Sequence, residues 1–242
     1  MLSWATVVAL FPTCLGEALN RAAVRDSARL LTAAGVASER PAGATCCGQP
    51  AWNSGFVRDA RRVARRTLRG LAEAEAVIVP AGSCAAMMRL HWPHLFHGER
   101  DQALAERVAA RTFELSQYLV DELGWRPPAP ANRAEVSYHD SCHMLRELRL
   151  HDQPRALLAA VADLRELPRA DRCCGFGGTF SVRYPDVSTA MADDKLASAA
   201  TAGAVTLASA DPGCVMQIEG RAARTGAGVR VVHLATVVAE AL

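Results

Sequence analysis

The residues of this chain best suited to chemistry are eight cysteines: Cys14, Cys46, Cys47, Cys84, Cys142, Cys173, Cys174 and Cys214. Thiolates are soft ligands that select zinc, copper(I) or iron–sulfur clusters. Two neighbouring cysteines in the chain fit poorly around one tetrahedral metal, but they can bridge two irons or bind neighbouring irons of a cluster. An even number of cysteines also suggests a disulfide framework, yet 242 residues can bury a core without such staples.

The cysteines repeat as two sets of four, which we call the first set (Cys14, Cys46, Cys47, Cys84) and the second set (Cys142, Cys173, Cys174, Cys214). The second set follows the first at offsets of 128, 127, 127 and 130 residues. Cys-Cys-Gly stands at 46–48 and again at 173–175, and each last cysteine follows a glycine by one or two residues. This period indicates two copies of one domain. We predict domains at 1–125 and 133–242, joined by the proline-rich linker 126–132.

Strands and helices must then bring each set together. Apolar runs at Thr6–Phe11 and Ala76–Val79 predict buried strands. Helical spacing of apolar residues predicts helices over Gly16–Ala34 and Ser54–Ala74, with Ser54 as the N-cap of the latter. Alternating strands and helices predict an α/β fold, in two pseudo-symmetric tandem copies of a small parallel-sheet domain. Binding sites in such sheets lie beyond the carboxyl ends of the strands, where most of the cysteines fall.

Composition and charge narrow the classes of protein. Half of the residues are apolar and 21% are charged, which excludes a disordered chain. A net charge of +2 excludes binding of nucleic acid by bulk charge. The apolar run Val7–Phe11 is too short for a membrane span, and we expect a cytoplasmic protein.

Each copy supplies the four thiols that a cubane cluster takes, so the residues favour iron–sulfur clusters, with zinc at one site as an alternative. Glycine after each cysteine pair allows close approach of the backbone and offers an N–H donor. His139 and His143 flank Cys142. They are candidates for a further ligand or for a proton acceptor toward a hydroxy-acid substrate, and a structural hydrogen-bonding role is the alternative.

Six segments carry a resemblance to a known family: PheProThrCysLeu (11–15), CysCysGlyGlnProAlaTrpAsnSerGly (46–55), GlySerCys (82–84), HisAspSerCysHisMet (139–144), CysCysGlyPheGlyGlyThrPheSerVal (173–182) and AspProGlyCysValMetGlnIle (211–218). With them the chain resembles the cysteine-rich CCG-domain proteins. These include the CCG-containing subunit of heterodisulfide reductase, the glycolate oxidase iron–sulfur subunit and, with the greatest likeness, the lactate utilization protein A family. The resemblance covers essentially the whole chain.

The resemblance implies an iron–sulfur electron-transfer subunit of a cytoplasmic complex that oxidises L-lactate to pyruvate. It implies one or two clusters of the 4Fe-4S type, bound by the eight cysteines. It also implies as partners a ferredoxin-like iron–sulfur subunit and a third subunit. The fuller CCG pattern has a fifth cysteine per domain, where this chain has Met87 and Gln217. A glycolate-oxidase-like or heterodisulfide-reductase-like subunit and a zinc-stabilised scaffold are the alternatives.

Overall fold

The computed structural model describes residues 7–242 and contains two four-stranded sheets, each with all of its strands parallel. The first sheet has the order β2-β1-β3-β4, and the second has the equivalent order β6-β5-β7-β8. The strands are β1 (Val7–Leu10), β2 (Ala37–Glu39), β3 (Val77–Val79), β4 (Thr112–Glu114), β5 (Glu135–Tyr138), β6 (Asp163–Arg165), β7 (Thr206–Ser209) and β8 (Arg230–His233). The predicted α/β fold with two tandem parallel-sheet copies is therefore confirmed.

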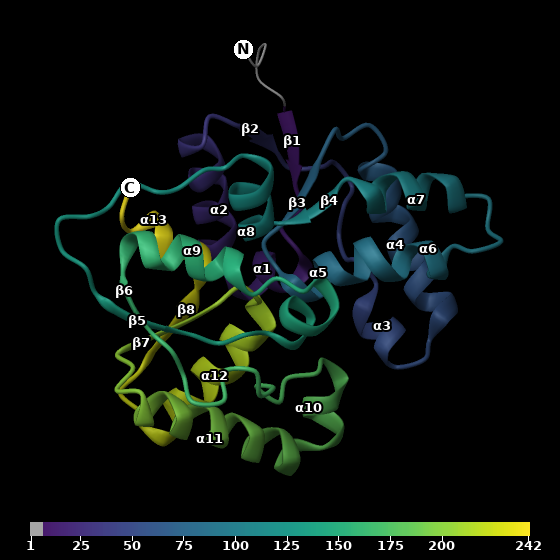
Figure 1. The fold of residues 1–242 in the computed structure, drawn as a ribbon. Coiled ribbons are helices and arrows are strands. Elements are labelled where there is room, and N and C mark those ends of the chain that lie inside the picture. The colour runs from purple at the N-terminus through teal and green to yellow at the C-terminus, as the bar shows by residue number, and fades with distance from the viewer. Residues whose placement is uncertain (1–6) are drawn as a thin grey trace.

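Helices connect the strands and cover the sheets (Figure 1). In the first half they are α1 (Cys14–Leu19), α2 (Arg21–Ala33), α3 (Gln49–Asn53), α4 (Val57–Gly70), α5 (Gly82–Ala86), α6 (Trp92–Leu95), α7 (Gln102–Ala110) and α8 (Leu115–Gln117). In the second half they are α9 (Asp152–Val161), α10 (Thr179–Arg183), α11 (Pro185–Thr201), α12 (Pro212–Thr225) and α13 (Leu234–Ala239). Three π-helical segments are η1 (Met87–His91), η2 (Tyr118–Glu122) and η3 (His143–Leu148). No helix among residues 7–242 combines the length and the apolar character needed to cross a membrane.

The two halves share a hydrophobic core. One cluster of buried residues joins Leu30 and Leu31 of α2 to Leu157 and Leu158 of α9 and to Val238 of α13. The C-terminal helix α13 packs against α2, at the opposite end of the sequence. Two further clusters lie within single halves, one under α4 to α7 and one under α11 and α12. The shared core fixes how the two sheets face each other, and the division into domains 1–125 and 133–242 stays a prediction.

Two of the predicted helices differ from the structure. The helix predicted over Gly16–Ala34 is broken at Asn20, because the Asn20 side chain accepts a hydrogen bond from the Ala23 N–H and so caps α2. Ser54 is not an N-cap: it ends α3, and its hydroxyl donates to the Pro50 carbonyl at 2.8 Å. The following helix begins only at Val57. The predicted strand Thr6–Phe11 is observed as β1, and Thr6 lies outside the described residues.

The last helix of each half begins at the end of a strand with a titratable cap. The Glu114 carboxylate accepts from Ser116 N at 2.7 Å before α8, and His233 Nδ1 accepts from Ala235 N at 3.1 Å before α13. Both side chains are buried. Burial raises the pKa of Glu114 to about 7 and lowers the pKa of His233 to about 4. In both cases burial favours the uncharged form.

Because the pKa of buried His233 is lowered, we expect the folded protein to lose stability in acid. The folded protein holds His233 neutral, whereas the unfolded chain takes up a proton below about pH 6.5. Stability present above pH 6.5 is lost as the pH falls toward 4, by roughly 3 kcal/mol in all. We expect His233→Asn, which keeps a capping acceptor without the titration, to flatten this loss. Thermal melts of both proteins from pH 7 to pH 4 measure it, and parallel melting curves across that range would contradict the prediction.

Candidate functional site

The cysteines lie beyond the carboxyl ends of three successive strands in each half. Cys14 begins α1 after β1, Cys46 and Cys47 stand in the loop after β2, and Cys84 lies in α5 after β3. The second half repeats this placement after β5, β6 and β7. All eight are free thiols, and the second member of each adjacent pair is the more buried. The parallel topology thus gathers residues that are up to 72 positions apart, as the sequence predicted.

The four thiols of the first set contact one another in a chain. Cys14 and Cys47 both lie beside Cys46, and the Cys47 thiol donates to Cys84 Sγ at 3.2 Å. Interaction with these neighbouring thiols lowers the pKa of Cys46 to about 3 and raises that of Cys14. A thiolate stabilised by its neighbours is the form in which cysteine binds a metal.

The second set repeats this chain of contacts. Cys142 and Cys174 lie beside Cys173, and Cys174 also lies beside Cys214. The same cause lowers the pKa of Cys173 to about 2 and raises that of Cys142. The two sets therefore have the same internal arrangement, with the stabilised thiolate on the first cysteine of each adjacent pair.

A glycine after each cysteine pair adopts a conformation that other residues rarely take. Gly48 has φ +89°, and an added Cβ would lie 2.7 Å from the Ala60 carbonyl oxygen. Gly175 has φ +87°, and its Cβ would lie 2.5 Å from the Ser188 carbonyl oxygen. Each glycine N–H points to the first sulfur of its pair, at 3.5 Å to Cys46 and 3.4 Å to Cys173. The predicted close approach and N–H donor are both present.

Different side chains hold the two cysteine loops in place. The Thr67 hydroxyl of α4 accepts from Cys46 N at 3.2 Å and donates to its carbonyl at 2.8 Å, and Trp92 Nε1 donates to the Cys47 carbonyl. In the second half, Lys195 of α11 is buried and donates to the carbonyls of Arg169 and Ala170, both at 3.1 Å. Lys195 is the only lysine of the chain.

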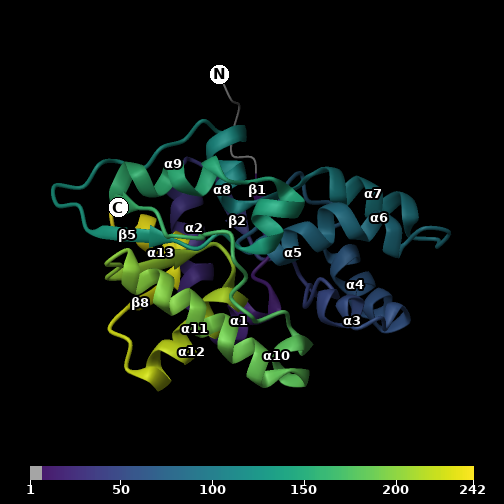
Figure 2. The ribbon, with the colours of Figure 1, turned by 60° about the horizontal axis from the view of Figure 1, so that its bottom comes forward.

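The two sets open on one cavity of about 360 Å³ between the halves. Its lining includes seven of the eight cysteines, all but Cys46, together with Leu15, Gln49, Pro50, His143, Phe176 and Val182 among others. The views in Figures 1 and 2 place α3 and α10 at the same end of the molecule, where the Ser54 and Thr179 hydroxyls are 3.0 Å apart. The lining is predominantly apolar, and among the described residues it includes no arginine or lysine.

The Asp211 carboxylate links the two halves by hydrogen bonds at this cavity. One carboxylate oxygen accepts from Gly213 N at the start of α12, and the other accepts from Ser83 N of the first half at 2.8 Å. Gly82 approaches Met144 of η3 so closely that a Cβ would meet its side chain at 2.4 Å. Sequence reasoning did not single out Asp211 in this role, although an aspartate before Pro-Gly is a recognisable helix cap.

His139 and His143 occupy different environments. His143 lines the cavity: its Nε2 lies 3.1 Å from the Gln49 amide nitrogen, and its Nδ1 lies 3.5 Å from Cys142 Sγ. Because Gln49 donates to Nε2, we assign the ring proton to Nδ1, facing the sulfur. His139 is fully buried behind the cavity lining, and burial lowers its pKa to about 3. It is therefore unsuited to accept a proton at neutral pH.

The two positions of the missing fifth cysteines are occupied by side chains with other contacts. Met87 is fully buried in the core cluster that also contains Cys47 and Cys84. The Gln217 amide donates to the Ser188 hydroxyl at 2.8 Å, and that hydroxyl donates to the Gly175 carbonyl. Gln217 thus supports the backbone of the second cysteine loop.

Comparison with known proteins agrees with this geometry. The family model described as a cysteine-rich domain, CCG, matches residues 8–89 and 136–219, which is more than half of the chain and one match in each half. Lactate utilization protein A of Geobacillus kaustophilus is 43% identical over 233 residues, covering 95% of this chain and 97% of the relative. The chain belongs to the lactate utilization protein A family of cysteine-rich CCG proteins.

Other members of the lactate utilization protein A family match over a similar length. The protein of Geobacillus thermodenitrificans is 41% identical and covers 95% of this chain and 97% of the relative. That of Anoxybacillus flavithermus is 41% identical over 95% of this chain and 98% of the relative. Among solved structures, glutamate racemase from Francisella tularensis aligns with 99% of this chain and 80% of its own at 11% identity, with a TM-score of 0.37. That similarity is too low to carry an argument.

Proposed function

We propose that this chain is the iron–sulfur electron-transfer subunit of a cytoplasmic complex that oxidises L-lactate to pyruvate. The observation that carries the proposal is the convergence of two sets of four free thiols, seven of which line one cavity between the halves. The name of the relatives, lactate utilization protein A, supports the substrate. The partners that we propose are a ferredoxin-like iron–sulfur subunit and a third subunit.

The residues present fit iron–sulfur clusters. Each set offers four sulfur atoms already in contact, one of them favoured as thiolate, with a glycine N–H directed at it. A cluster of the 4Fe-4S type takes four thiolates, so each set would hold one. Such a cluster, when bound, supplies reversible one-electron transfer. Zinc in place of one cluster is the alternative for either set.

The cavity favours electron transfer over turnover of the hydroxy acid by this chain itself. Oxidation of lactate to pyruvate releases two electrons and two protons, and it needs a group that holds the lactate carboxylate. Within the described chain no arginine or lysine lines the cavity, and Asp211 contributes a negative charge. His143 directs its Nδ1 proton at Cys142 and its Nε2 at Gln49, so it positions the sulfur. We infer that the carboxylate of the substrate binds elsewhere in the complex.

Metal analysis of anaerobically purified protein tests the proposal. We expect a brown protein with about eight irons and about eight sulfides per chain, and an EPR signal after reduction. A colourless protein that holds only zinc would contradict electron transfer and favour the scaffold alternative.

Growth experiments test the substrate. We expect deletion of the gene in its source organism to abolish growth on L-lactate and to leave growth on pyruvate unchanged. Loss of growth on glycolate in place of lactate would support the glycolate-oxidase alternative.

A further inference from the structure

The second set differs from the first by one buried imidazole. His139 follows β5, and its backbone N–H donates to the Ala208 carbonyl at 2.9 Å. Phe11 follows β1, and its backbone N–H donates to the Ile78 carbonyl at 2.9 Å. The two residues thus occupy equivalent places in the two halves, and both are fully buried. The first half therefore has the hydrocarbon ring of Phe11 at the place where the second half has the imidazole of His139, with its two nitrogen atoms.

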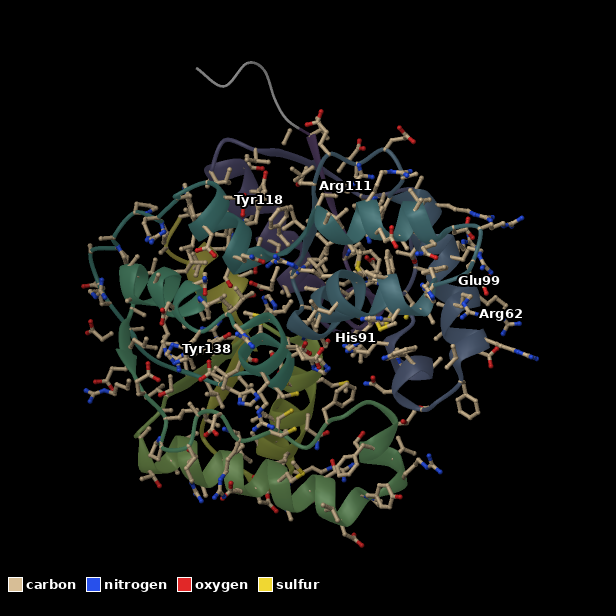
Figure 3. All side chains as sticks on the ribbon, turned by 45° about the vertical axis from the view of Figure 1, so that its right-hand side comes forward. Arg62, His91, Glu99, Arg111, Tyr118 and Tyr138 are labelled. Atoms are coloured by element: carbon tan, nitrogen blue, oxygen red, sulfur yellow. The ribbon has the colours of Figure 1, made fainter. Side chains whose placement is uncertain are left out.

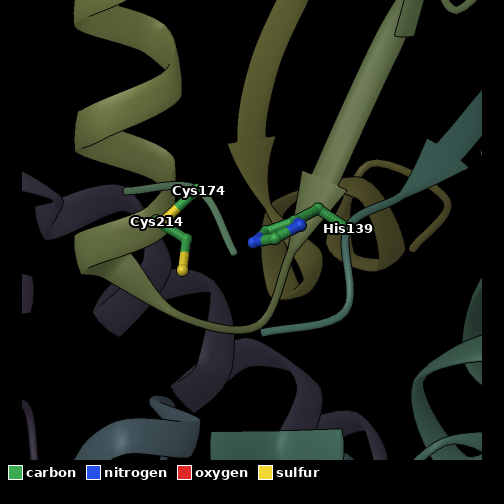
Figure 4. A group of neighbouring side chains, drawn as sticks. All are labelled: His139, Cys174 and Cys214. Atoms are coloured by element: carbon green, nitrogen blue, oxygen red, sulfur yellow. The ribbon is translucent and has the colours of Figure 1, made fainter. Parts of the chain in front are cut away.

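The imidazole of His139 is buried without a well-formed hydrogen bond. By contact geometry neither ring nitrogen has a partner among residues 7–242, and the Ala170 carbonyl only faces the ring. An unpaired buried polar group is destabilising, and a metal bound at a ring nitrogen would remove that penalty. A ring nitrogen lies within 4.8 Å of the sulfur atoms of both Cys174 and Cys214. Figure 4 shows the ring extending from the end of β5 toward these two side chains.

The surroundings also fix the orientation of the ring. The Ala170 carbonyl faces His139, and Lys195 Nζ holds that carbonyl at 3.1 Å. Histidines that bind metals commonly have a carbonyl beside the second ring nitrogen, which sets the tautomer. Gln217 stands where the fuller CCG pattern has its fifth cysteine, and it is already hydrogen-bonded to Ser188.

We propose that His139 is a nitrogen ligand to the metal centre of the second set, which gives that centre mixed cysteine and histidine ligation while the first set binds through cysteines alone. This inference rests on the proposal that the second set binds a metal. Where His139 takes an iron site in place of one of the four thiolates of its set, the reduction potential of that centre would be raised. Within the proposed function, the second centre is then the stronger electron acceptor of the two.

Pulsed EPR on anaerobic, reduced protein tests the ligation. We expect a strong ¹⁴N coupling from a directly bound imidazole, replaced by the ¹⁵N pattern when the protein is labelled with ¹⁵N-histidine. His139→Phe, which copies Phe11 of the first half, should abolish the coupling and lower the potential of one centre. His143→Gln is the matched control, since this cavity histidine lies beside Cys142, and it should leave the coupling intact. A coupling that survives in His139→Phe, or one lost in His143→Gln alone, would overturn the proposal.

Two further measurements keep the test decisive. If His139→Phe does not fold, His139→Cys supplies a thiolate in the same place, and it should retain the metal without the nitrogen coupling. If the second set holds zinc, X-ray absorption at the zinc edge should show a nitrogen ligand that His139→Phe removes, and its absence in the unaltered protein would overturn the proposal. Zinc with a histidine ligand would contradict electron transfer at this set while supporting His139, so the two proposals fail separately.

Discussion

Replacement of Cys47 by serine is expected to remove about half of the bound iron, from about eight to about four irons per chain. Cys47 is the buried member of the first adjacent pair, and its thiol connects Cys46 to Cys84. A serine hydroxyl is a hard donor and a poor substitute for thiolate toward iron. The loss should be confined to the first set, because the contacts of the second set involve none of its sulfurs.

Cys174→Ser is the matched control for Cys47→Ser, since Cys174 has the same place in the second set. It should also remove about half of the iron, but it should abolish the signal that carries the nitrogen coupling. Iron and sulfide assays measure the cluster content of each variant, and EPR shows which signal is lost. If either substitution removed all of the iron, the two sets would share one centre, in contradiction to the proposal of one cluster per set.

Replacement of Arg155 by methionine is expected to destabilise the protein by about 3–5 kcal/mol. The Arg155 guanidinium donates to both oxygens of Asp140 at 2.8 Å, and it also binds Glu166. It lies 5.4 Å from the ring centroid of Tyr138, which is labelled in Figure 3. Asp140 is nearly fully buried, so the substitution would leave its charge without a partner. Arg155 itself has a raised pKa, with burial opposing the effect of the two carboxylates.

The expected decrease in Tm for Arg155→Met is about 6–20 °C for a chain of this size. Asp140 lies between His139 and the loop that carries Cys142, so metal content of the second set should fall as well. Arg165→Met is the control, because Arg165 pairs with Glu135 on the exposed surface and should change the Tm little. Calorimetry and iron assays compare the two, and equal melting temperatures for both variants would contradict the prediction.

The sequence was informative about the fold wherever the pattern was local and repeated. Short apolar runs before Cys14 and Cys84 predicted β1 and β3, and both strands are present. The two helix predictions that were wrong concern side chains that can have either of two local roles. Asn20 breaks a continuous helical pattern by capping α2, and Ser54 ends a helix in place of beginning one. Apolar spacing cannot distinguish these roles, because capping depends on which backbone N–H groups are left free.

The sequence by itself determined the two sets of cysteines, their pairing into copies and the glycine that each pair needs. Those features depend on residue type and spacing, which the chain carries directly. Only the tertiary structure decided that both sets open on one cavity and that His139 and His143 differ in role. His139 stands three residues before Cys142 and His143 directly after it, so proximity in sequence predicts similar roles for both. The fold instead buries the His139 ring beside Cys174 and Cys214, because β5 pairs with β7, the strand that leads into α12. It leaves His143 at the cavity beside Gln49 of the other half.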